Sequence, residues 1–269
     1  MLGKVISLIS AIACVYIAFV ALIYFAQPRL VYFPTRAIVA TPDNIGLLYE
    51  DVNLRTHGGV EIHGWYVRKK DARWTVLLLH GNGGNISHRL DTLRILHELG
   101  VDTLIIDYPG YGKSGGRPDE QGTYDAATAA WQFLAVNATN PGKIILFGRS
   151  LGGVIAVWLA KRVDPAGLIL ESTFTSLADM ARHHYPFLPV SLISRYDYDA
   201  ISTAADITVP VLMVHSVQDE IVPFELGAEL YDALPGRKAF LEIRGGHNDG
   251  FLVTGREYTN GIKLFLESL

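Results

Sequence analysis

One serine stands in a pattern that could make it a nucleophile. Ser150 occupies the centre of Gly148-Arg149-Ser150-Leu151-Gly152, after an apolar run that ends at Phe147 and before a stretch of helix-forming residues. A strand, a serine between glycines and a helix form a sharp turn that exposes the hydroxyl, and the helix dipole there favours developing negative charge. Five such residues can coincide by chance, but the surrounding strand and helix predict that Ser150 attacks an acyl carbonyl.

A base and an acid are expected to follow the serine in the chain. His247 lies in a glycine-rich loop after the last apolar run, and Asp219 lies in a polar turn after an earlier one. In this order Asp219 would orient and stabilise the imidazole, and His247 would remove the proton from Ser150. Ser150, Asp219 and His247 are therefore predicted to form a catalytic triad.

Other acidic residues compete for the role of the acid. Glu220 is the neighbour of Asp219, and Glu171 directly follows an apolar run. Asp219 is better placed within its turn than Glu220. Glu171 is the reserve candidate for the acid. Asp107 and Asp249 are expected to form turns.

A second glycine-rich loop, at residues 80–85, is expected to complete an oxyanion hole. Such a hole needs two backbone N–H donors, one from the residue after the nucleophile and one from a loop upstream of it. We assign the first donor to Leu151 and the second to Asn82, with His80 and Gly81 organising the loop. The alternative is a plain strand-to-helix turn without a catalytic role.

Short apolar runs alternate with helix-like segments along most of the chain. The runs lie at 75–79, 103–106, 143–147, 167–170, 211–214 and 240–243, and the helical segments at 85–99, 121–137, 151–162, 224–234 and 255–269. Unbroken apolar runs suit strands buried on both faces, and the alternation predicts an α/β fold whose mainly parallel, twisted sheet carries helices on both faces. Residues 49–67 alternate in polarity around a glycine turn, which predicts an antiparallel hairpin.

The region 172–208 breaks this alternation and is rich in His, Tyr, Pro and Ser. We predict that it forms a small cap over the site. The expected organisation is an N-terminal membrane anchor at 1–29 and one catalytic domain at 30–269 that includes the cap.

The N-terminus predicts a membrane-spanning helix. Val5–Ala26 carries no charge, and its length of about 22 residues exceeds the roughly 20 that a spanning helix needs. Pro28 is expected to end the helix. A cleaved signal peptide would have a shorter apolar core, and a lipoprotein signal at Cys14 would be followed by polar residues. The charges of Lys4 and Arg29 lie on opposite sides of the span, so the orientation stays open.

Bulk properties narrow the classes of partner. The net charge is −4 and the sequence holds no run of basic residues, so nucleic acid is not expected as a partner. Cys14 is the single cysteine, which excludes an intrachain disulfide and a cysteine-based zinc site. The pair His183-His184 has no second pair of ligands at metal-binding spacing, so it does not indicate a metal site. The triad supplies both nucleophile and base, so neither a metal nor an organic cofactor is implied.

Seven stretches carry a resemblance to a known family. They are residues 30–34, 80–89, 107–115, 148–153, 171–176, 219–223 and 246–249. Together they resemble the α/β-hydrolases with a membrane-anchoring N-terminal helix, similar to the ABHD-type lysophospholipases and protein depalmitoylases and to their bacterial homologues. One departure is His215-Ser216, which stands where that family usually has His-Gly and bears on the geometry of the turn before Asp219.

The resemblance and the triad together imply a serine hydrolase of the esterase, lipase or thioesterase type. We expect it to cleave carboxylic esters or thioesters of acyl or lipid-like small molecules, beside a membrane whose side is undetermined. Two alternatives stay open: a serine peptidase or amidase of the same fold, and a non-catalytic binding protein on a hydrolase scaffold.

Overall fold

The apolar runs form one eight-stranded sheet in the computed structural model, which describes residues 1–138 and 140–269. The strand order is β10-β9-β8-β7-β4-β6-β3-β2, with β2 antiparallel to β3, β3 antiparallel to β6 and the other pairs parallel. The strands are β2 (Glu50–Arg55), β3 (Glu61–Val67), β4 (Thr75–Leu79), β6 (Asp102–Ile106), β7 (Ile144–Arg149), β8 (Gly167–Glu171), β9 (Val211–Ser216) and β10 (Lys238–Ile243). The predicted mainly parallel sheet and its antiparallel hairpin are confirmed.

Alternating side chains of the central strands build a core on each face of the sheet. On β4, Leu77 and Leu79 pack toward one helical layer, whereas Val76 and Leu78 pack toward the other. The first layer contains α3 (Glu120–Asn137), α4 (Leu151–Ala160) and α8 (Phe224–Ala233), and the second contains α2 (Leu90–Glu98), α9 (Gly250–Thr254) and α10 (Arg256–Ser268). Because both faces of β4 are covered, its sequence is apolar throughout.

The strand order reverses between β4 and β7, and this reversal sets the place of the site. From β4 the chain crosses to β6 on one side, and from β6 it returns to β7 on the other side of β4. In open α/β sheets, the crevice at such a reversal lies beyond the carboxyl ends of the strands and receives ligands. The loop after β4 and the turn after β7 therefore meet there.

Short elements connect the glycine-rich loop to the N-terminal segment. Strand β1 (Phe33–Pro34) pairs with β5 (Gly83–Gly84), and the single-turn helices are η1 (Pro42–Ile45), η2 (Ile86–His88) and η3 (Pro141–Lys143). The helix predicted at 85–99 begins only at Leu90, because the Asn85 side chain accepts the Ser87 N–H and caps η2 instead.

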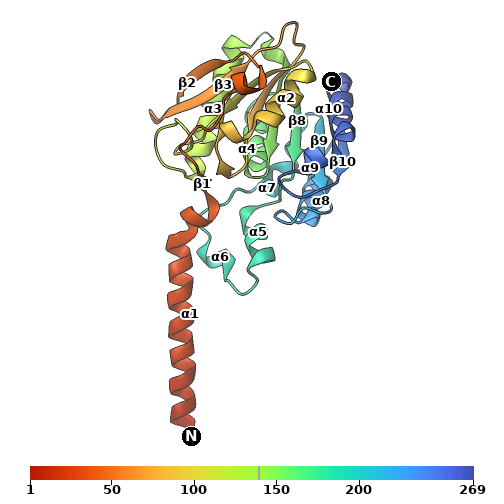
Figure 1. Ribbon diagram of the computed structural model, residues 1–269. Helices are drawn as coiled ribbons and strands as arrows, with labels where there is room; N and C mark the ends of the chain where they lie inside the picture. The colour runs from red at the N-terminus through yellow and green to blue at the C-terminus, as the bar shows by residue number, and fades with distance from the viewer. Residues whose placement is uncertain (139) are drawn as a thin grey trace.

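The N-terminal helix α1 (Leu2–Val31) projects away from the α/β domain (Figure 1). It is the one helix in the described residues that is long and apolar enough to cross a membrane, and its most apolar window has no buried residue. The prediction that Pro28 ends the helix is wrong. The proline removes one N–H bond, but its own carbonyl accepts the Tyr32 N–H at 3.1 Å, and burial of Val31 and Tyr32 in the domain core fixes this last turn.

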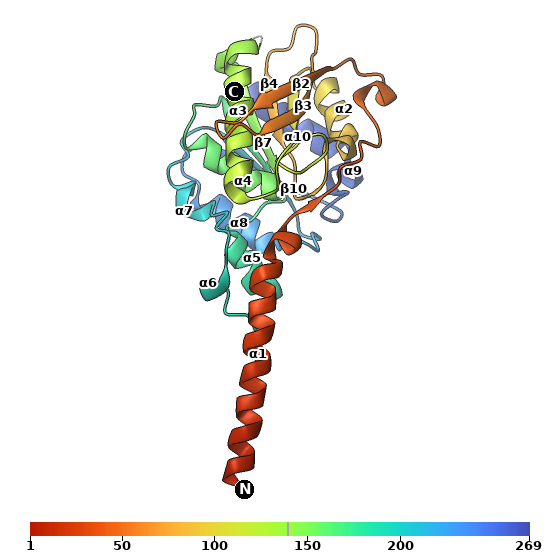
Figure 2. The same ribbon diagram turned by 90° about the vertical axis from the view of Figure 1, so that its left-hand side faces the viewer.

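The cap segment, residues 172–208, lies beside the end of α1 that meets the domain (Figures 1 and 2). Its helices are α5 (Leu177–His184), α6 (Val190–Ile193) and α7 (Ile201–Ala204). The Tyr32 and Tyr198 hydroxyls lie 2.9 Å apart in the core, and Gln27 Nε2 donates to the Ile193 carbonyl oxygen at 2.7 Å. The cap segment therefore packs on α1 as well as on the domain.

Candidate active site

Ser150 lies at the turn between β7 and α4 in a strained backbone conformation. Its φ is 53° and its ψ is −121°, a combination that a residue with a side chain adopts only where its surroundings impose it. Two neighbours impose it here: the Ser150 N–H donates to the Glu171 carbonyl oxygen at 2.9 Å, and the Thr173 hydroxyl donates to the Ser150 carbonyl oxygen at 2.8 Å. Strain of this kind is concentrated at functional sites.

The glycines around Ser150 allow α4 to lie against the sheet. A Cβ atom on Gly152 would stand 2.0 Å from the Leu79 carbonyl oxygen, and one on Gly148 would stand 2.2 Å from the Gly152 carbonyl oxygen. Both separations are far below van der Waals contact, so only glycine fits at either position. The pattern on each side of Ser150 is thus a packing requirement of this turn.

His247 and Asp219 form a short side-chain hydrogen bond. His247 Nδ1 lies 2.8 Å from Asp219 Oδ2 and 3.0 Å from Oδ1, and the Asp219 side chain is 0% exposed. The Ile221 and Val222 N–H groups also donate to Asp219 Oδ1. Burial alone would raise the pKa of the Asp219 carboxyl, but the hydrogen bond and charge of His247, with the two backbone donors, hold it below its usual value. An ionised Asp219 leaves Nε2 of His247 available as a base.

The structure does not join all three predicted residues by hydrogen bonds. Within residues 1–138 and 140–269, Ser150 Oγ makes no hydrogen bond to His247. Arg149 connects the two loops instead, because its Nη2 donates to the His247 carbonyl oxygen. Sequence reasoning missed this role of Arg149, although the residue stands inside the motif beside Ser150.

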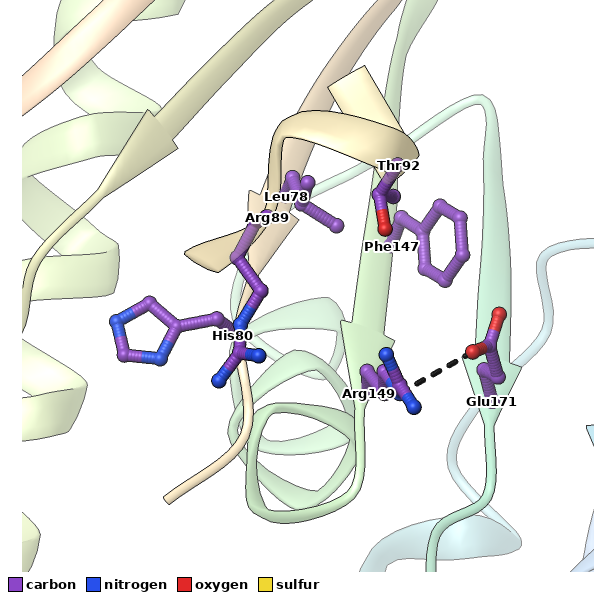
Figure 3. A pocket seen from close by; sticks show the side chains of 7 residues that line it. All are labelled: Leu78, His80, Arg89, Thr92, Phe147, Arg149 and Glu171. Atoms are coloured by element: carbon purple, nitrogen blue, oxygen red, sulfur yellow. Dashed lines mark ion pairs between the residues drawn. The ribbon is translucent and has the colours of Figure 1, made fainter. Parts of the chain in front are cut away.

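Glu171, the reserve candidate for the acid, is held by other partners. Glu171 Oε1 lies 3.2 Å from Arg149 Nε, and the Tyr258 hydroxyl donates to Glu171 Oε2 at 2.6 Å. Figure 3 shows Arg149 and Glu171 turned toward one another. They line a cavity of about 10 Å³, close to the space for one water molecule, together with Leu78, His80, Arg89, Thr92 and Phe147. The Glu171 carboxylate is therefore paired with Arg149 and Tyr258, while the Glu171 backbone carbonyl supports the turn at Ser150.

The glycine-rich loop predicted to form the oxyanion hole lies against Ser150. A Cβ atom on Gly81 would stand 3.3 Å from Ser150 Cβ, and the His80 ring nitrogen Nδ1 lies 2.6 Å from the Gly81 carbonyl oxygen. The Tyr108 hydroxyl donates to the His80 carbonyl oxygen at 2.9 Å. Leu151 is the first residue of α4, where an N–H has no acceptor inside the helix.

Asn82 is clamped by the segment that leaves α1. Its Nδ2 donates to the Val31 carbonyl oxygen at 2.8 Å, and its own carbonyl oxygen accepts the Phe33 N–H at 3.1 Å and the Tyr111 hydroxyl at 2.7 Å. Three bonds thus fix the Asn82 residue whose N–H is the predicted second donor. Nothing in the spacing of the sequence signals this contact, because its partners are about 50 residues apart.

Ser216, the departure from the family pattern, has a visible role. Its hydroxyl donates to the Gly245 carbonyl oxygen at 2.6 Å and accepts the Gln218 N–H at 3.0 Å. A glycine could make neither bond. The serine therefore ties the turn that carries Asp219 to the loop that carries His247.

His215 is expected to make the folded protein sensitive to mild acid. Burial lowers the pKa of its imidazole, whose Nε2 lies 3.1 Å from the Val222 carbonyl oxygen. The unfolded chain binds this proton near pH 6.5, so stability is present above that pH and is lost, by up to about 1.4 kcal/mol per pH unit, as the pH falls below it. We expect the melting temperature of the detergent-solubilised protein to fall between about pH 7.5 and about pH 5.5.

The His215→Gln variant is the control for this fall, since glutamine keeps an N–H for Val222 but does not titrate. Its melting temperature should change less over the same pH interval. An equal fall in both proteins would show that other groups cause the acid sensitivity.

Solved structures define the class of this fold. The esterase Pf2001 from Pyrococcus furiosus superposes with a TM-score of 0.73 at 22% identity, covering 88% of this chain and 97% of that chain. An alpha-beta hydrolase from Vibrio vulnificus gives a TM-score of 0.65 at 22% identity, covering 84% and 83%. The fold is that of the α/β-hydrolases.

Sequence comparison then gives the family. The protein-family model described as "Serine aminopeptidase, S33" matches residues 70–195. The alpha/beta hydrolase domain-containing protein WAV2 of Arabidopsis thaliana is 35% identical over 84% of this chain and 81% of its own length. An uncharacterized membrane protein of Saccharomyces cerevisiae is 31% identical over 85% and 83%. Protein bem46 of Schizosaccharomyces pombe is 36% identical over 70% and 67%. The chain belongs to this membrane-anchored α/β-hydrolase family. Its membership of that family supports the assignment of the chain as a hydrolase.

Proposed function

We propose that the chain is a membrane-anchored serine hydrolase that cleaves carboxylic esters or thioesters of acyl or lipid-like small molecules. The observation that carries the proposal is that three features lie at the carboxyl ends of the parallel strands. These are the strained Ser150, the buried His247–Asp219 pair and the glycine-rich loop against Ser150. A serine with a purely structural role needs neither the His247–Asp219 pair nor the glycine-rich loop.

The proposed reaction is a two-step acyl transfer to water. Ser150 Oγ attacks the acyl carbonyl carbon while His247 Nε2 takes its proton, and the oxyanion accepts the N–H groups of Asn82 and Leu151. The proton passes from His247 to the leaving alcohol or thiol, and an acyl-Ser150 ester remains. Water attacks that ester with His247 again as the base, which releases the acid and restores Ser150. The missing bond between Ser150 and His247 suits a site that tightens when substrate binds.

The N-terminal helix supports the proposed location at a membrane. Its 30 residues span about 45 Å at the rise of an α-helix, more than the roughly 30 Å hydrocarbon layer. Its exposed apolar surface is unlike that of a core helix, and one relative is itself described as a membrane protein. The anchor would keep the site beside lipid-like acyl substrates.

The test uses the detergent-solubilised full chain. A fluorophosphonate probe should label the protein, and peptide mass spectrometry should place the label on Ser150, with Ser150→Ala unlabelled. A series of p-nitrophenyl esters from acetyl to palmitoyl should then be hydrolysed with a preference for longer acyl groups. Absence of label on Ser150 in folded protein would favour the binding-scaffold alternative.

The description of the matching family model favours a second candidate, a serine aminopeptidase. The same triad cleaves amides when the leaving amine is protonated by the histidine. Aminoacyl p-nitroanilides measured beside the esters separate the two. Higher kcat/KM on the anilides would replace the esterase proposal with the peptidase.

A further inference from the structure

The tip of the cap segment, residues 185–193, is apolar and exposed. Its sequence Tyr-Pro-Phe-Leu-Pro-Val-Ser-Leu-Ile contains no charged residue. Tyr185, Phe187 and Leu192 are exposed by 51%, 58% and 82%. The cationic residues Arg182 and Arg195 flank this uncharged tip in the sequence, one on each side.

Contacts place this tip alongside the apolar part of α1. The Tyr16 hydroxyl donates to the Phe187 carbonyl oxygen at 2.8 Å, and the Phe19 and Phe187 rings lie 6.4 Å apart. Both anchor residues fall within the uncharged run that would cross the bilayer. Figures 1 and 2 agree that α6 lies beside α1.

The contacts also give the depth of the tip. Gln27, at the edge of the uncharged run, accepts the Arg195 N–H at 2.9 Å. Tyr16 lies about 16 Å further along the helix axis at the rise of an α-helix, roughly half the hydrocarbon thickness. If α1 spans the bilayer, Arg195 lies at the level of the head groups and Phe187 lies deep in the acyl chains.

Several backbone N–H groups of this region have partners inside the protein. In hydrocarbon each backbone polar group needs an internal partner. Within the tip, the N–H groups of Leu188, Val190 and Leu192 bond to carbonyls of the tip itself, and its two prolines have no N–H. The Tyr16 hydroxyl, a polar atom in the middle of the apolar run, is satisfied by the tip.

We infer that residues 185–193 are a second membrane-inserted element, embedded beside α1 in the acyl-chain layer of the leaflet nearest the catalytic domain. The inference rests on the proposed anchor and extends it. The bound partner is the phospholipid acyl chain, while Arg182 and Arg195 lie among the head groups. His184, the last residue of α5 and the residue directly before the tip, has its Nε2 2.9 Å from the Ile221 carbonyl oxygen, two residues from Asp219. The inserted tip therefore holds the catalytic edge of the sheet close to the lipid surface.

The test is depth-dependent fluorescence quenching in reconstituted protein, and Cys14 as the single cysteine makes it direct. In a Cys14→Ser background, Leu192→Cys is labelled with an NBD fluorophore and placed in phosphatidylcholine vesicles that contain doxyl-labelled phosphatidylcholine. Leu48→Cys is the matched control, because Leu48 is 85% exposed on the catalytic domain and Leu192 is 82% exposed on the tip. Labelled Cys14 in the otherwise unchanged chain reports the anchor.

We expect the label at position 192 to lose intensity, with a blue-shifted emission, but less than the label at Cys14, because the adjacent Ile193 carbonyl bonds to Gln27 at the edge of the uncharged run. The label at 48 should keep its intensity. Quenching at Cys14 but not at 192 overturns the inserted tip and leaves the anchor intact. Loss of quenching at Cys14 itself overturns the anchor and the tip together. Neither result depends on hydrolysis, so ester assays of the same samples report the proposed activity separately.

Discussion

Replacing Asp219 with asparagine is expected to lower kcat by about 10⁴-fold, with little change in KM. The Asp219 carboxylate is fully buried and accepts from His247 Nδ1 at 2.8 Å, which keeps the proton on Nδ1 and leaves Nε2 as the base. An asparagine amide can turn an N–H toward the ring, favour the other tautomer and no longer stabilise the imidazolium. Steady-state kinetics on a p-nitrophenyl ester measure the loss.

Glu220→Gln is the matched control for this change, because it converts the neighbouring carboxylate into an amide. Glu220 Oε2 accepts the His247 backbone N–H at 2.9 Å, and a glutamine oxygen can keep that bond. Its kcat should stay within about tenfold of the unchanged protein, the size expected for a small shift in geometry. A large loss in Glu220→Gln with activity retained in Asp219→Asn would assign the acid to Glu220.

The features that the sequence predicted well are those that local patterns determine. A strand covered on both faces must be apolar throughout, so β4 and β7 could be located within a residue or two, and their alternation with helices predicted the sheet. The turn at Ser150 also follows from local sequence, since Gly148 and Gly152 are required by their neighbours' carbonyl oxygens.

The features that escaped prediction depend on contacts between distant segments. Arg149 donates to a carbonyl 98 positions away, and Ser216 to one 29 positions away, so neither role leaves a periodic signal. The helix continues past Pro28 because Val31 and Tyr32 are buried in the domain, a tertiary effect that outweighs a local breaker. Local sequence patterns located the candidate groups, and tertiary contacts decide how these groups are held.

The second large effect is expected from the clamp on Asn82, which makes the length of an N-terminal truncation decisive. Removing residues 1–34 deletes the Val31 carbonyl and the Phe33 N–H that fix Asn82, together with the β1–β5 pairing. Loss of one positioned oxyanion donor costs about 10²- to 10³-fold in kcat. We therefore expect a fall of that size on p-nitrophenyl acetate, a soluble ester that needs no membrane.

Removing only residues 1–26 is the matched truncation, because it deletes the whole uncharged run but keeps every contact of Asn82. Its kcat on the same ester should stay within a few-fold of the full chain, since the donor stays in place. Equal activity in the two truncations would show that the clamp does not position the donor.

Removal of residues 1–34 also deletes Val31 and Tyr32 and with them their core contacts, so misfolding is a second possible cause of a fall in activity. Asn82→Ala in the full chain separates the two causes, because it keeps the backbone N–H and loses only the side-chain bond to Val31. A lower kcat with unchanged KM and unchanged melting temperature would assign the effect to positioning of the donor. That result would make the last turn of α1 part of the structure that positions the proposed oxyanion donor.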